Sequence, residues 1–97
     1  MPPITMNREA AERIALDALA FIAADDEMGG AFLGATGASA DDLRTLASDP
    51  GFLVAVLDFL TSRDDWTLAF AEAQGIAPET PLAARHALPG GEEVAWT

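Results

Sequence analysis

A seven-residue string occurs twice in this chain of 97 residues with little change, as AFLGATG at residues 31–37 and as AFAEAQG at residues 69–75. A shift of 38 positions, which places residue 31 on residue 69, aligns residues 14–41 with residues 52–79 without a gap. Self-similarity at a fixed period is typical of chains built from repeated structural units. The sequence therefore predicts two copies of one folding unit.

The matching residues are those that a helical unit has to keep. Four of the five phenylalanines pair with each other in this register. An acid suited to begin a helix (Asp26 with Asp64) and a glycine suited to end one (Gly37 with Gly75) pair as well. The ambiguous apolar run at residues 52–60 is interpreted as a helix because it aligns with the strongly helical residues 14–22.

The predicted fold is all-α: a compact bundle of about six short helices in a single domain over residues 1–97, built from two tandem three-helix repeats. The repeats cover about residues 11–47 and 49–87. Periodicity and capping signals place helices at about residues 8–24, 40–47, 50–62 and 78–87, a short helix that Asp26 caps and Gly37 ends, and a helix over residues 66–74 that Asp64 caps and Gly75 ends. Residues 89–97 are predicted to be a loose tail.

Each repeat is too short to bury its apolar face alone. We therefore expect the two copies to pack on each other, with approximate twofold symmetry. The helix over residues 50–62 is apolar nearly all round, which is typical of a central helix, and we expect it to be the spine of the domain.

Charge and composition narrow the classes of function. Sixteen acids against five arginines, with no lysine, give a formal net charge of −11. Such a field repels nucleic acids and anionic membranes and favours a basic protein partner. The chain has no cysteine, no segment long enough to span a bilayer and no secretory signal. We expect a cytoplasmic protein without direct nucleic-acid or membrane binding.

No motif in the sequence specifies catalysis, a cofactor or a metal. The acid clusters at residues 25–27, 41–42 and 64–65 lie at predicted helix starts, where carboxylates cap amides, and the spacing of a calcium loop is absent. His86, the only histidine, has no serine or cysteine partner in a recognisable motif. The glycine-rich residues 29–37 lack the lysine of a phosphate loop.

Residues 70–85 resemble a helix-turn-helix motif, but the second helix carries little positive charge for a DNA groove. The two tryptophans are the candidates for contact with a protein partner. Trp66 aligns with Met28 and is also expected to contribute to the core, whereas Trp96 falls in the tail.

The strings ERIALDALAFIAADDE, FLGATGASADDLR, DPGFLVAVLDFL and LAFAEAQG resemble a small family, found mainly in alphaproteobacteria, of uncharacterised helical domains. The resemblance covers about residues 8–88. It implies a compact all-helical cytoplasmic bacterial protein, and it brings no catalytic residues with it.

We therefore expect a non-enzymatic, acidic protein–protein interaction or small regulatory module that binds a protein partner or itself. Two alternatives stay open at the level of the sequence. One is an enzyme or divalent-metal site built on the helix-start acid clusters, and the other is a helix-turn-helix-like protein that acts with nucleic-acid machinery.

Overall fold

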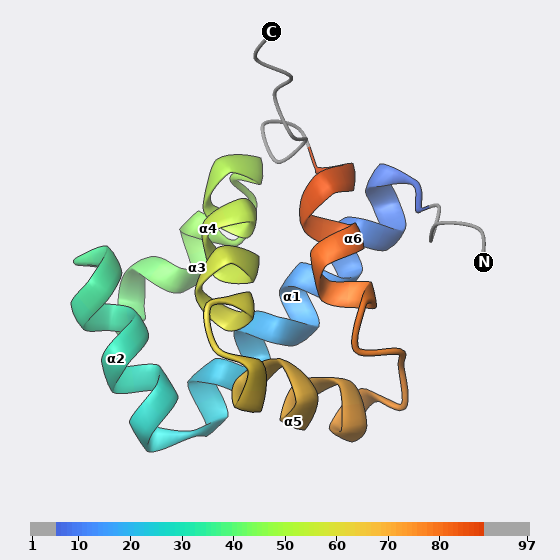
Figure 1. Cartoon of the computed structure of the whole chain (residues 1–97). Helices are drawn as coiled ribbons and strands as arrows, with labels where there is room; N and C mark the ends of the chain where they lie inside the picture. The colour runs from blue at the N-terminus through green and yellow to red at the C-terminus, as the bar shows by residue number, and fades with distance from the viewer. Residues whose placement is uncertain (1–5, 89–97) are drawn as a thin grey trace, which may run out of the picture.

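The computed structural model of the chain describes residues 6–88, and within them every regular element is a helix. The predicted all-α fold is thus confirmed. The elements, shown in Figure 1, are α1 (Arg8–Ala24), α2 (Asp26–Thr36), the 3-10 turn η1 (Ala40–Asp42), α3 (Leu43–Leu46), α4 (Pro50–Thr61), α5 (Asp64–Gln74) and α6 (Thr80–Ala87).

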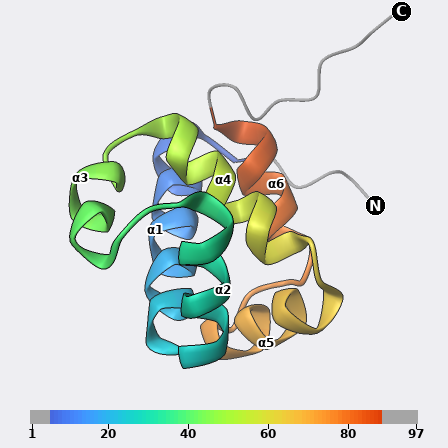
Figure 2. The ribbon, with the colours of Figure 1, turned by 90° about the vertical axis from the view of Figure 1, so that its left-hand side faces the viewer.

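The core forms where α1, α4 and α6 pack against one another, with α2 beside α1 and α5 beneath α4 and α6 (Figures 1 and 2). Small residues of α1 allow this close packing, since Ala11, Ala15 and Ala18 are fully buried. Helix α4 contributes Leu53, Val56, Leu57 and Leu60. As expected of a spine, α4 packs against several other helices, but α1 also does so and is equally central.

Local capping chemistry sets most helix starts. Asn7 Oδ1 accepts a hydrogen bond from Ala10 N at 2.8 Å and begins α1. Asp49 Oδ1 accepts one from Gly51 N at 2.9 Å, and Pro50 occupies the first position of α4. Both starts agree with the prediction.

Three predicted starts are displaced. Asp25 caps α2 in place of Asp26, because its Oδ1 accepts from Met28 N at 2.8 Å. Asp64 is the first helical residue of α5, and Arg63 stands at the cap position without a side-chain cap. The last helix begins at Thr80, because Pro78 and Glu79 form a turn.

The structure places related residues of the two predicted repeats in related settings. The bounds of α2 and α5 differ by 38 positions at both ends, and each helix stops at a left-handed glycine, Gly37 (φ 73°) or Gly75 (φ 68°). Glycine tolerates this conformation at little cost. The tandem repeat itself stays a prediction.

The aromatic contacts are reciprocal between the two predicted repeats. Phe21 of α1 meets Phe70 of α5 edge to face, with ring centroids 5.4 Å apart. The residues that align with these two, Phe59 and Phe32, form the same T-shaped contact at 5.1 Å. Approximate twofold symmetry between two copies would produce this exchange, in which the first helix of each copy meets the second helix of the other.

The third helices depart from such symmetry. Helix α6 packs against both α1 and α4 and buries Pro81 and Ala84. In its counterpart, η1 and α3 form barely two turns with no fully buried residue. The predicted single helix over residues 40–47 is therefore a 3-10 turn followed by one α-helical turn.

Candidate functional site

Two surface hollows are the candidate sites of this molecule. The second hollow, as we name it from its place in the chain, lies between the end of α4, helix α5 and the start of α6, with a volume of about 480 Å³. Leu68 and Leu82 line it, and they leave 54% and 47% of their surfaces exposed. Asp64 and Glu79 place carboxylates at its edge.

The first hollow lies between α1, α2 and the η1–α3 segment, with a volume of about 230 Å³. It reaches the core, because Ile22 and Phe32, each only 1% exposed, form part of its lining. Gly30 and the exposed acids Asp25 and Asp26 line it on the α2 side. The first hollow is thus smaller but deeper than the second, whose described lining residues are all at least partly exposed.

The two hollows occupy corresponding places in the predicted repeats. Five residues that line the second hollow follow, by 38 positions each, five that line the first. The pairs are Ala23 with Thr61, Asp26 with Asp64, Gly29 with Thr67, Gly30 with Leu68, and Ala40 with Pro78. Each hollow therefore has an aspartate in the first turn of its second helix, where the helix dipole favours an acid.

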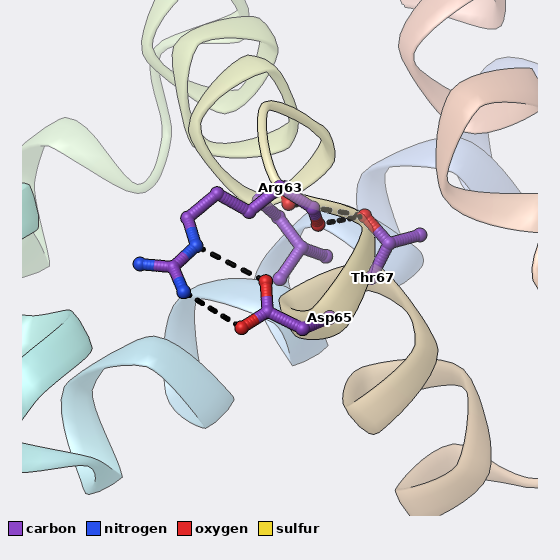
Figure 3. A network of polar contacts seen from close by, with 4 residues as sticks. Arg63, Asp65 and Thr67 are labelled. Atoms are coloured by element: carbon purple, nitrogen blue, oxygen red, sulfur yellow. Dashed lines mark hydrogen bonds and ion pairs between the residues drawn. The ribbon is translucent and has the colours of Figure 1, made fainter.

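The pair Gly29 and Thr67 lies where the second helix of each predicted repeat packs against the end of the first. A Cβ atom added to Gly29 would lie 3.2 Å from the Ile22 carbonyl oxygen, so glycine allows α2 to approach the end of α1 closely. At the corresponding position of α5, the Thr67 hydroxyl lies 3.0 Å from the Leu60 carbonyl oxygen and 2.9 Å from that of Arg63 (Figure 3). The small size of Gly29 thus allows α2 to pack against the end of α1, and the hydroxyl of Thr67 joins α5 to the end of α4 by hydrogen bonding.

An ion pair at the start of α5 holds Trp66 in place. The Arg63 guanidinium donates to both carboxylate oxygens of Asp65, from Nε at 3.0 Å and from Nη2 at 2.7 Å (Figure 3). This contact lowers the pKa of Asp65 and raises the pKa of Arg63. The same guanidinium carbon lies 4.4 Å from the ring centre of Trp66, which stacks at 5.0 Å on Phe59.

The structure places Trp66 mainly in the core, with 9% of its surface exposed. Its role in partner binding stays a prediction. The other predicted contact residue, Trp96, lies outside the described residues.

Two of the three acid clusters supply a carboxylate that accepts hydrogen bonds at a helix start, whereas the cluster at residues 64–65 lies in the first turn of α5 without a side-chain cap. Besides Asp25 and Asp49, Asp42 Oδ2 accepts from the Ser39 backbone N–H at 3.1 Å and from its hydroxyl at 3.0 Å. These hydrogen bonds, the backbone one first, lower the pKa of Asp42. Within residues 6–88, no group of three or more acids and histidine is placed to hold a metal ion.

The remaining sequence candidates do not converge on either hollow. His86 is exposed in the last turn of α6. Arg85, in the helix-turn-helix-like segment, forms an ion pair with Asp58 of α4. In the part of the chain that the structure describes, no helix has the length and apolarity needed to cross a membrane.

Sequence reasoning missed the residues that distinguish the hollows, namely Gly30, Leu68 and Leu82. The signal that could have found Gly30 and Leu68 is a mismatch in the repeat register, because a glycine aligned with a leucine indicates two different surfaces.

Residues 8–91 match a family model described as protein of unknown function (DUF3572), and the chain belongs to that family. Comparisons with curated proteins and with solved structures give no match.

Proposed function

We propose that this member of the DUF3572 family is a non-enzymatic interaction module of the cytoplasm that binds a basic segment of another protein. The observation that carries the proposal is the second hollow, where two half-exposed leucines lie beside two carboxylates. Exposed apolar side chains that gather in one concave site favour contact with a partner over a solvated role.

Charge selects the kind of partner. The chain carries a net charge of −11, so a cationic segment is attracted to it and a second copy of the chain is repelled. A basic amphipathic helix suits the site, because its apolar face can cover Leu68 and Leu82 while its lysines or arginines approach Asp64 and Glu79.

The test uses a short helical peptide of leucine and lysine, with the leucines on one face, which we name the Leu/Lys peptide. Binding is followed through the NMR signals of the Thr67 and Leu82 backbone amides at about 0.15 M salt, where charges far apart are screened. We expect saturable shifts at these amides, and affinity weaker by about tenfold in Leu68→Ser, as for a contact at the centre of an interface.

Leu16→Ser is the matched control, because Leu16 is an exposed leucine of α1 (43%) that lines neither hollow. It should leave the affinity unchanged, and a peptide with glutamate in place of lysine should not bind. Equal binding of the two peptides, or equal loss in Leu68→Ser and Leu16→Ser, would refute the proposal.

A further inference from the structure

We infer that the first hollow is a second docking site, which takes a leucine-sized apolar side chain of a basic partner segment together with a lysine or arginine at Asp26. The inference rests on the proposed function, since it assigns the same class of partner to a second place on the molecule. It is carried by the correspondence of the hollows and by the one position at which their linings differ most, Gly30 against Leu68.

The space above Gly30 is open. A Cβ atom added there would meet no other atom within 4 Å, although the hollow continues down to the core residues Ile22 and Phe32. Helix α5 carries its own leucine at the corresponding position. The first hollow therefore has a floor that includes buried apolar residues, and at residue 30 helix α2 places no side chain where α5 has Leu68, so a partner's leucine can occupy that position.

The helix itself gives no reason for this glycine. Glycine lowers helix stability relative to alanine or leucine, and Gly29 next to it is explained by its close approach to the Ile22 carbonyl. No contact requires a glycine at residue 30, and because Gly30 lines the hollow, α2 places no side chain there.

The acidic residues beside the first hollow favour a cationic partner segment. Asp25 and Asp26 are both exposed at the rim of the first hollow, and Asp26 aligns with Asp64 of the second. A partner that offers an apolar side chain next to a cation matches both features. Two copies of such an element on one partner would engage both hollows, and linkage would strengthen the binding without any new contact.

The inference predicts that two Leu/Lys peptides bind each chain, which titration calorimetry measures as the stoichiometry. Gly30→Leu fills the first hollow and should lower the stoichiometry from two to one, while the amide shifts at Thr67 and Leu82 persist. Gly34→Leu is the matched control, because Gly34 lies in the same helix, is exposed, has no atom within 4 Å of an added Cβ and lies outside the lining. It should leave the stoichiometry at two.

Both glycine variants should fold, and thermal unfolding checks this. Charge reversal gives a second readout that does not depend on packing. Asp26→Lys should weaken binding at the first hollow by about tenfold, whereas Glu9→Lys, which makes the same change of charge in the first turn of α1 and lines neither hollow, should not.

Failure of the inference can be told from failure of the proposed function. A stoichiometry of one in the native chain, or of two in Gly30→Leu, overturns the inference alone when Leu68→Ser still weakens binding. No effect of either substitution overturns both. Loss at the first hollow with no effect of Leu68→Ser supports the inference and refutes the assignment of the second hollow.

Discussion

The two predicted repeats of this chain, about residues 11–47 and 49–87, make the same aromatic contact but use their third helices differently. Phe21 meets Phe70 as Phe59 meets Phe32. Helix α6 lies against the core, whereas α3 stays at the edge with no buried residue. The two similar sequences thus share the aromatic contact that joins them and differ in how deeply their third helices are buried.

The largest expected effect tests whether the two aromatic contacts are equivalent. Phe32→Ala and Phe70→Ala each remove a fully buried ring, and each should lower the free energy of unfolding by about 4 kcal/mol. Unfolding in urea measures both. Leu16→Ala, at an exposed site, should cost less than about 1 kcal/mol. A loss below about 2 kcal/mol in only one of the two phenylalanine variants would break the equivalence.

An intermediate effect sharpens the difference between the third helices. Ala84 of α6 follows Leu46 of α3 by 38 positions, and Ala84 is fully buried while Leu46 is partly exposed. Ala84→Leu overpacks the contact of α6 with α1 and α4 and should cost about 1–3 kcal/mol.

Leu46→Ala, the matched substitution in α3, should cost less than about 1 kcal/mol because that helix is peripheral. Urea unfolding measures both variants. If Leu46→Ala proves more costly than Ala84→Leu, then α3 is part of the core and the comparison made above is wrong.

Local chemistry explains why the helix bounds could be predicted closely. The caps at Asn7 and Asp49 and the stops at Gly37 and Gly75 depend on residues within one helical turn, so the sequence contains their whole cause. The displaced start of α2 also has a local origin, because the adjacent acids Asp25 and Asp26 can both serve as its cap. Asp25 rather than Asp26 is the cap of α2, because its carboxylate accepts a hydrogen bond from Met28 N. In α5 the cap position is occupied by Arg63, and Asp64 is the first helical residue.

The role of each third helix could not be predicted, because it depends on packing between distant segments. Leu43 and Leu46 make α3 appear the better core element, yet the core takes Pro81 and Ala84 of α6. Small residues let a helix approach α1 and α4 closely. The hydrophobic periodicity of the sequence contains no information about the distance between packed helices. The hollows were missed for a related reason, since each is lined by residues of separate elements.

The smallest expected effect concerns the ion pair between Arg63 and Asp65 at the start of α5, which has no counterpart at the start of α2. The Arg63 guanidinium lowers the pKa of Asp65, so the carboxylate of the folded chain releases its proton at lower pH than that of the unfolded chain. Its contribution to stability is therefore present above the ordinary aspartate range, about pH 4, and is lost as pH falls through the lowered pKa. Because both side chains are exposed, that contribution should be small and should fall with salt.

Asp65→Asn tests this contribution, because it removes the carboxylate and keeps the side chains of Arg63 and Trp66. The native chain should be slightly more stable than Asp65→Asn at neutral pH, and the difference should vanish in acid. NMR titration of the Asp65 carboxyl provides the direct measurement, and in Arg63→Gln its pKa should rise toward the ordinary value. Titration in the ordinary range in the native chain, with no change in Arg63→Gln, would show that the ion pair does not persist in solution. Trp66 would then be held by Phe59 and the core alone, and this difference between α5 and α2 would disappear.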